Sequence, residues 1–474
     1  MSEVVTESAS TPRSTAPVIG GGRVSVAPRI RPGWPLTALL VLYPLWWALG
    51  LGTLILFVLT VPMVAHLRHR RIAVPPGFGL WMLFLVWAVA SAAMLQYDPP
   101  GVAAGAASKR LVTVVFTLAC YAAVTVVLLY VGNLTEEEFP RQKLIRQLGA
   151  LFCTVVAGGV LGTVAPHFQF TAPFEMLLPG SVRSNGFVQS LVHPTAAQVQ
   201  SVLGFDSGRP AAPFGYTNMW GNCLVLLLAW FAIGWLRGGT RERRILGGII
   251  LAVAAVPTVY SLNRGMWLGL GVAMLFMLLR LLGRGSLAAA GAMIAAATVI
   301  GVALVASPLS TIIQDRLAHP HSNETRAFTT ERTLDAVTYS PLLGYGSTRQ
   351  PLGNGSSIAV GASANCPRCG SPPLGSNGQL WAILIMHGIG GVVLFVGFFL
   401  RGIWAYRRDR TPIGDAGLLA LVLSLFFMFV YNALAIPLLI SFISLGLLWR
   451  NDRDGRSTGS GLPRARYVSF ARQQ

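Results

Sequence analysis

Twelve apolar segments of roughly membrane-spanning length constrain this chain more than any other feature. A helix needs about 20 predominantly apolar residues to cross the hydrocarbon core of a bilayer. The chain is 53% hydrophobic and only 11% charged, a composition typical of membrane proteins and not of soluble domains. The sequence therefore predicts an all-α fold, a polytopic membrane helix bundle of about 12 transmembrane helices. The segments lie near residues 35–49, 51–67, 78–95, 111–131, 147–164, 216–236, 245–260, 265–282, 286–306, 378–400, 414–432 and 434–449.

These segments divide the chain into five parts. Residues 1–33, rich in Ser, Thr, Pro and Gly, predict a disordered cytoplasmic tail. They do not resemble a cleavable signal, because the apolar stretch that follows continues too long. Residues 34–306 are expected to hold helices one to nine, and residues 378–450 the last three. Residues 307–377 would form a large folded outer loop between helices nine and ten, and residues 451–474 a basic cytoplasmic tail.

Basic residues indicate how the bundle is oriented. With the N-terminus inside, 26 of the 36 Lys and Arg residues fall on the cytoplasmic side, as the positive-inside rule requires. Both termini are then cytoplasmic, and residues 307–377 face outward. The net charge of +19 is thereby explained by topology, so we expect no nucleic-acid partner.

Ten basic residues fall on the outer side, and six of them stand out as departures from this rule. Arg264 is the clearest case, since it lies in the sequence Ser-Leu-Asn-Arg-Gly between two apolar segments. A charge at such a place is functional by default, although an arginine that snorkels from a helix end is an alternative. Several such cations together would bind an anion, and a diphosphate matches the fork of a guanidinium group. The six are Lys109, Arg110, Arg183, Arg209, Arg264 and Arg326.

The segment 307–377 is too long and too polar to be a simple connection. It carries arginines, acids and two histidines. It also has apolar residues that we expect to anchor it as a folded cap: Leu334, Val337, Tyr339, Leu342, Leu343 and Tyr345. Its Cys366 and Cys369 favour a disulfide in an oxidising compartment. A structural zinc site would need four ligands, so we expect no metal.

The outer segment before the apolar run 216–236 contains Arg209 in front of a proline-rich turn. Asn218 and Asn222 follow, one helical turn apart on one face. Amides at a helix entrance can bind a sugar or a phosphate, and helix capping is the alternative.

The sequence lacks residues that two functional classes usually require. The middle of each apolar segment lacks Asp and Glu, whereas ion-coupled transporters normally carry intramembrane carboxylates. A glycine-rich nucleotide loop is also missing, so an ATPase is not expected.

Four motifs in order resemble the superfamily of O-antigen ligases and polymerases, which are bacterial envelope proteins. Arg209 with the Pro-Phe-Gly-Tyr-Thr-Asn that follows is similar to the family's entrance to a middle helix. Residues 261–270 resemble its Ser-Arg-Gly-x-Trp helix start, and give Arg264 and Trp267. Arg326 with residues 340–346 resembles an arginine followed by Pro-Leu-x-Gly-x-Gly. Residues 377–391 resemble a loop-to-helix signature with two spaced glycines, here Gly388 and Gly391.

The resemblance covers mainly residues 200–400. It implies a membrane glycosyltransferase of the cytoplasmic membrane that transfers or polymerises a glycan for cell-surface polysaccharide assembly. The donor would be a glycan on a polyprenyl diphosphate, used at the outer face without nucleotide, metal or other cofactor. The acceptor would be a glycan, a lipid or a protein. The implied donor diphosphate-binding residues are Arg209, Arg264, Arg326, Lys109, Arg110 and Asn218.

The expected catalytic base departs from the family pattern. Asn377 stands where the ligases carry a histidine, and an amide cannot accept a proton. Other candidates in the same segment are Glu331, His319 and His321, with Glu324 and Asp335. His387 lies about ten residues further on, or ~15 Å into the helix, and is expected to be a packing residue. The departure at Asn377 leaves a second class open, a lipid-linked-sugar exporter or an envelope-assembly protein without enzymatic activity.

Overall fold

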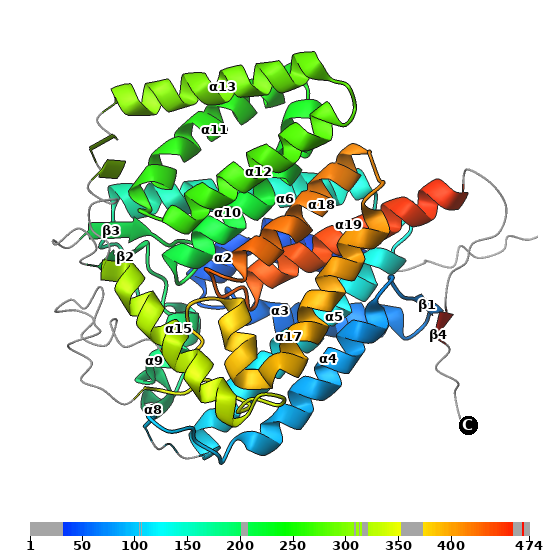
Figure 1. Ribbon diagram of the computed structural model, residues 1–474. Coiled ribbons are helices and arrows are strands. Elements are labelled where there is room, and N and C mark those ends of the chain that lie inside the picture. The colour runs from blue at the N-terminus through cyan, green and yellow to red at the C-terminus, as the bar shows by residue number, and fades with distance from the viewer. Residues whose placement is uncertain are drawn as a thin grey trace, which may run out of the picture. The chain divides into compact units, whose positions relative to one another are not determined.

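The computed structural model describes residues 32–457, except 104, 106, 201–206, 308, 309, 312, 315–320 and 352–372, and also residues 467 and 468. The described chain is mainly helical (Figure 1). Its elements are α1 (Trp34–Val41), α2 (Tyr43–Ala48), α3 (Ile55–Leu67), β1 (Ile72–Ala73), α4 (Phe78–Ser91), η1 (Ala92–Met94), α5 (Ala107–Asn133), α6 (Arg141–Val164), α7 (Pro173–Met176), α8 (Gly180–Arg183), α9 (Gly186–Val192), β2 (Ala197–Gln200), β3 (Ser207–Pro210), α10 (Thr217–Phe231), η2 (Ala232–Arg237), α11 (Arg241–Tyr260), α12 (Arg264–Leu282), α13 (Leu287–Ala306), α15 (His321–Tyr339), α17 (Gln379–Tyr406), α18 (Pro412–Phe427), α19 (Ile436–Ser457) and β4 (Tyr467–Val468).

Within the described residues, six helices are long and apolar enough to cross a membrane: α5, α6, α10 with η2, α11, α12 and α17. Four shorter apolar helices accompany them, at α3, α4 with η1, α13 and α18. Each apolar segment expected from the sequence contains helix, and the first segment forms two short helices, α1 and α2. An all-α membrane bundle is therefore consistent with the structure. The count of twelve spans and the outward side of residues 307–377 stay predictions.

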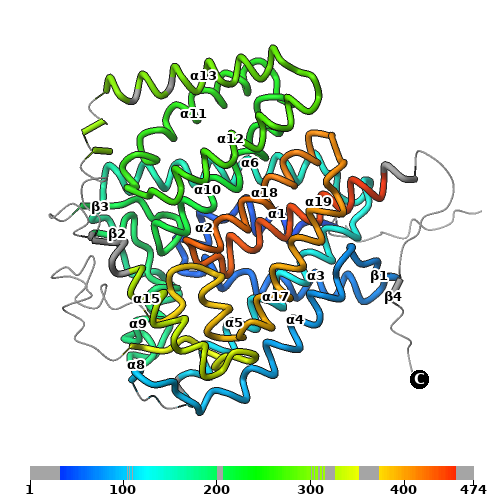
Figure 2. Tube along the Cα trace, in the orientation of Figure 1, coloured from blue at the N-terminus to red at the C-terminus, as the bar shows by residue number. Residues whose placement is uncertain are grey.

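The centre of the bundle is built by α10, α18 and α19, which run side by side (Figure 2). α10 also packs on α6, α19 on α5, and α17 on α4. Small residues allow close approach, since a Cβ on Gly159 of α6 would lie 2.5 Å from the Trp220 ring of α10. Polar pairs also join these helices, because Trp230 Nε1 donates to Ser444 Oγ at 2.9 Å.

The last helix continues past the expected end of its apolar segment at residue 449 and ends at Ser457. The reason is Arg450, whose side chain is fully buried. Its Nη2 donates to the carbonyl oxygens of Thr135 and Phe139 and to Glu136 Oε1, at 2.9, 2.6 and 2.9 Å. A paired arginine can therefore extend a helix that hydropathy alone would end.

α17 is interrupted at Gly388, which has a φ of 63°. The segment 341–346 enters the break, and the Ile389 N–H donates to the Pro341 carbonyl at 2.7 Å. A Cβ at position 388 would lie 2.2 Å from the Leu342 carbonyl oxygen, so only glycine fits there. The Pro-Leu-x-Gly-x-Gly motif thus fills the break in α17 and is hydrogen-bonded to the helix on both sides of it. Two further bonds cross the break, from Tyr345 N–H to Ile385 O (2.9 Å) and from Gly346 N–H to Met386 O (2.8 Å).

α15 packs on α17. Val337 and Tyr345 are buried there in a small cluster with Ala336, Ile385 and Met386. The sequence was wrong to assign the same role to three other apolar residues of this segment. Leu334, Tyr339 and Leu342 are 48%, 67% and 65% exposed. Leu342 meets the break in α17 through its backbone carbonyl and not through its side chain.

Elements β2, β3, α9 and α15 gather at one end of the bundle, on the left in Figure 1, and the C-terminal end of α19 lies at the opposite end. The helices α10, α12 and α17 begin at residues 217, 264 and 379, and the contacts described below join these starts to β3 and α15. This end of the bundle therefore holds most of the polar residues that the sequence selects.

Candidate functional site

Arg209 is placed by a short hairpin. β2 and β3 pair antiparallel, and Gln198 lies opposite Arg209. The Arg209 Nε donates to the Ser261 carbonyl at 2.7 Å, which ties the hairpin to the end of α11. The Arg209 carbonyl accepts from Thr217 Oγ1 at 3.1 Å, while the Thr217 N–H donates to Gln198 Oε1 at 2.8 Å. The hairpin is therefore fixed to the start of α10 as well.

Asn263 and Arg264 lie at the sharp connection between α11 and α12. Leu262 has a φ of 53°, which is strained for a residue with a side chain and costs on the order of 1–3 kcal/mol. Asn263 caps α12, because its side chain accepts from the Met266 N–H at 3.4 Å. The same oxygen also accepts a hydrogen bond from the Tyr431 hydroxyl. The strained connection is thus held from both sides.

The amide nitrogen of Asn263 links this connection to α10. Its Nδ2 lies 3.5 Å from Asn218 Oδ1 and 3.5 Å from the Thr217 carbonyl oxygen. Asn218, which the sequence selects as a donor ligand, is partly exposed, and Asn222 one turn deeper is buried. The first of the two amides is therefore the one that remains accessible at the helix entrance.

Arg326 reaches the same place from α15. Its Nη1 donates to the Val430 carbonyl at 3.4 Å, beside Tyr431. The Asn377 Nδ2 donates to the Arg326 carbonyl at 2.7 Å and to Thr330 Oγ1 at 2.8 Å. Asn377 therefore joins the start of α17 to α15 and fixes the backbone that carries Arg326.

Electrostatic interactions connect the three arginines. Burial lowers the pKa of Arg326, the Tyr431 hydroxyl raises it, and the charge of Arg264 lowers it further. Arg326 and Arg209 in turn both act electrostatically on the Tyr431 hydroxyl. Arg209, Arg264 and Arg326, from β3, α12 and α15, therefore gather around Tyr431 and Asn263. We call these three residues the arginine group.

Among the described residues, other candidates from the sequence lie in α5 and α15. Arg110 is ion-paired with Asp98 at 2.7 Å, and Lys109 lies in the first turn of α5. Glu331 is exposed on α15, where His321 is the first residue. His319, Cys366 and Cys369 lie outside the described residues. The proposed roles of all these residues stay predictions.

His387 has the packing environment that the sequence suggests. The residue is 2% exposed, and its ring meets Phe84 edge to face at a centroid distance of 5.7 Å. Its backbone carbonyl accepts from Trp87 Nε1 at 2.9 Å. These contacts bind the end of the first half of α17, next to the break at Gly388, to α4.

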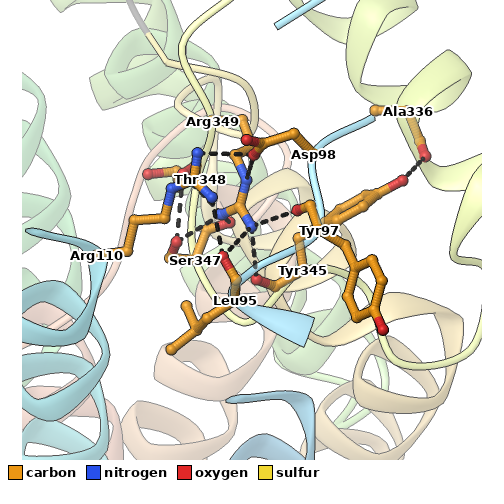
Figure 3. A network of polar contacts seen from close by, with 9 residues as sticks. All are labelled: Leu95, Tyr97, Asp98, Arg110, Ala336, Tyr345, Ser347, Thr348 and Arg349. Atoms are coloured by element: carbon orange, nitrogen blue, oxygen red, sulfur yellow. Dashed lines mark hydrogen bonds and ion pairs between the residues drawn. The ribbon is translucent and has the colours of Figure 1, made fainter. Parts of the chain in front are cut away.

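A second cluster of arginines, which the sequence does not reveal, centres on Arg349 (Figure 3). The Arg349 side chain is 1% exposed, and its Nε lies 2.8 Å from Asp98 Oδ1, the oxygen that also pairs with Arg110. Burial and the charge of Arg110 lower the pKa of Arg349, and Asp98 raises it. Arg349 Nη2 donates to the carbonyls of Tyr97 and Tyr345 at 2.9 and 3.1 Å. We call Asp98, Arg110 and Arg349 the Asp98 cluster.

The Asp98 cluster joins residues far apart in the chain, since Asp98 and Arg349 are 251 positions apart. It holds the connection between α4 and α5 against the segment that enters the break in α17. The sequence shows an acid at position 98 and an arginine at position 349. Nothing in their spacing predicts that the two side chains pair.

A buried carboxylate paired with a histidine is the other polar feature that sequence reasoning missed. Glu175 Oε2 lies 2.8 Å from His193 Nδ1, in the segment between α6 and β2.

Among the described residues, no three His, Cys, Asp or Glu side chains come together as metal ligands would.

Comparisons with known proteins do not identify a family for this chain. No protein-family model matches it, and no curated protein matches it. Its function must therefore be inferred from the residues and their arrangement.

Proposed function

We propose that this protein is a membrane glycosyltransferase that takes a glycan from a polyprenyl-diphosphate-linked donor. It transfers or polymerises that glycan at the outer face of the bacterial cytoplasmic membrane, for cell-surface polysaccharide assembly. The observation that carries the proposal is the arginine group. Three guanidinium groups from distant parts of the chain gather at one end of a helix bundle with candidate membrane spans.

A diphosphate suits this group better than a single carboxylate would. Guanidinium groups bind phosphate oxygens in pairs of parallel hydrogen bonds. The repulsion between Arg264 and Arg326, which contributes to the lowered pKa of Arg326, would be relieved by an anion between them. The partly exposed amide of Asn218 could donate to a phosphate or sugar oxygen.

The chemistry follows from the leaving group. When the bond between the anomeric carbon and phosphate breaks, negative charge develops on the lipid diphosphate. Arginines already in place stabilise that charge without reorganising, and this is the main way in which enzymes lower such barriers. The strained Leu262 and the capping residue Asn263 fix the α11–α12 connection, which holds Arg264 in a defined position.

The test uses the purified protein in lipid vesicles with a synthetic polyprenyl-diphosphate-linked oligosaccharide and a glycan acceptor. We expect release of polyprenyl diphosphate together with a longer glycan. The matched control is Arg237→Ala, which removes an arginine at the other end of the α10–η2 helix and should leave turnover unchanged. An exporter would move the donor between leaflets without breaking the sugar–phosphate bond, and that result would reject the enzyme.

A deletion strain provides the cellular counterpart. Loss of the enzyme should leave the surface glycan absent or shortened, with lipid-linked intermediates accumulating. Normal surface glycans and no accumulation would contradict the proposal.

A further inference from the structure

The pair formed by Glu175 and His193 has the arrangement of an oriented base. Glu175 lies in α7, and His193 directly follows α9. The Glu175 side chain is 4% exposed and that of His193 is 22% exposed. The carboxylate is therefore withdrawn from solvent, while the imidazole remains reachable.

Glu175 is held in place by other donors besides the histidine. Its Oε2 accepts from the Ala172 N–H at 3.3 Å, and its Oε1 accepts from Gln189 Nε2 at 3.4 Å. An ionised carboxylate can only accept hydrogen bonds, so His193 Nδ1 carries the hydrogen in this pair. The other ring nitrogen, Nε2, then carries the lone pair, as a general base requires.

His193 lines a small cavity. The cavity has a volume of about 60 Å³ and is also lined by Trp47, Thr53, Ser190 and Tyr216. About 10–15 Å³ of such volume is enough for one water molecule, so the cavity has room for a hydroxyl group. Because Nδ1 is turned to Glu175, Nε2 is the nitrogen that remains for a hydroxyl in this cavity.

The cavity is joined to the arginine group by a few residues of chain. Gly215 and Tyr216 line it. The next residue is Thr217, whose hydroxyl donates to the Arg209 carbonyl and whose own carbonyl faces Asn263 Nδ2. The segment 215–217 thus borders the imidazole cavity on one side and the arginine group on the other.

We propose that His193 is the general base that accepts the proton of the acceptor hydroxyl, and that Glu175 is its positioning residue. This inference rests on the proposed glycan transfer. The acceptor oxygen forms a bond to the anomeric carbon of the donor, and the bond from that carbon to phosphate breaks. The bonding electrons leave with the diphosphate, the hydroxyl proton moves to His193 Nε2, and the imidazolium later returns it to water.

With His193 as the base, the reaction has the proton acceptor that Asn377 cannot be. Asn377 cannot accept a proton, and its amide already donates to Arg326 O and Thr330 Oγ1. His193 lies in the segment before α10, whereas the sequence directed attention to residues 307–377. A merely structural role remains the competing explanation, because Glu175 also joins α7 to α9.

The experiment separates these roles through His193→Asn and Glu175→Gln in the full-length protein. Asparagine keeps a donor for Glu175 but provides no base. We expect kcat to fall about 100-fold or more in His193→Asn, while KM for the donor and the melting temperature stay unchanged. Glu175→Gln should lower kcat by a smaller factor. His167→Asn is the matched control, since His167 is exposed in the same segment, and it should behave as the wild type.

A wild-type kcat in His193→Asn would overturn the inference and leave the proposed function standing. A fall in melting temperature and donor affinity in step with kcat would overturn it in favour of a structural pair. Should asparagine prevent folding, His193→Gly with added imidazole replaces it, and only a base role predicts that imidazole restores turnover. Absence of transfer by the wild type would instead reject the proposed function, and with it any role for a base.

Discussion

The arginine group and the Asp98 cluster use the same side chain for opposite purposes. In the Asp98 cluster, two guanidinium groups share one carboxylate oxygen, at 2.7 and 2.8 Å. The Arg349 side chain is almost completely withdrawn from solvent. In the arginine group, Arg209 donates to the carbonyl of Ser261 and Arg326 to that of Val430. The first cluster is built on one shared carboxylate, and the second brings guanidinium groups from three elements near one another.

The difference shows how a membrane protein can separate structure from ligand binding. A buried arginine with its carboxylate is costly to break and holds two distant segments together. Positive charges that lie near one another repel, and an added anion lowers that cost. We therefore expect the Asp98 cluster, Arg110 included, to serve stability, and we propose the arginine group as the diphosphate site.

The largest effect is expected at the arginine group. Arg264→Ala should lower the transfer rate about 100-fold and weaken donor binding, because it removes a guanidinium that faces the leaving diphosphate. Arg264→Lys keeps the charge without the planar fork and should give an intermediate loss. Turnover and donor affinity are measured in vesicles, and melting temperature serves as the control for folding.

Arg110→Ala is the matched change in the other cluster. It should lower stability and leave the donor affinity of the folded protein unchanged. An equal loss of donor affinity in Arg110→Ala and Arg264→Ala would abolish the distinction between the two clusters.

The next effect concerns stability. Arg349→Met removes a buried guanidinium and leaves Asp98 paired only with Arg110. Because Asp98 is one quarter exposed, we expect a loss of roughly 2–3 kcal/mol, at or below the range for a fully buried pair. Thermal or denaturant unfolding measures it, and turnover per folded molecule should be retained. Loss of donor affinity without loss of stability would place Arg349 in the ligand site instead.

Hydropathy located the apolar helices, but it did not reveal the polar helix α15 or the polar contacts between helices. The expected apolar segment 265–282 is almost identical to α12, which spans Arg264–Leu282. The break in α17 could not be derived, because it depends on the backbone of residues 341–346 filling the gap at Gly388. Arg450 extends α19 for a similar reason, since its partners lie in another part of the chain.

The same limit applies to the site. The cost of a cation on the outer side singled out Arg209, Arg264 and Arg326, and these three lie near one another. Arg110 met the same criterion but is paired with Asp98, a contact that local sequence does not specify. Glu175 and His193 were passed over because their pairing depends on the turns between α7 and α9, which hydropathy does not encode. The roles of all these residues in transfer stay predictions.

The smallest effect is a pH dependence of the Asp98 cluster. Burial acts to raise the pKa of Asp98, but the hydrogen bonds and charges of Arg110 and Arg349 outweigh it and lower the pKa below its ordinary value. A carboxyl group with a lowered pKa in the folded state stabilises the protein at pH values above its unfolded pKa, which is about 3.9 for Asp. That contribution is lost as the pH falls through the lower, folded value.

Asp98→Asn should therefore be less stable than the wild type near neutral pH, and the difference should narrow below about pH 4. The measurement is the melting temperature of both proteins across this range. Asp335→Asn serves as the control, since Asp335 is exposed on α15, and its difference from the wild type should stay small throughout. A difference for Asp98→Asn that does not change on acidification would mean that the charge of Asp98 contributes nothing to the cluster. The neutral hydrogen bonds of Arg349 to Tyr97, Ser347 and Tyr345 would then be what holds the two segments together.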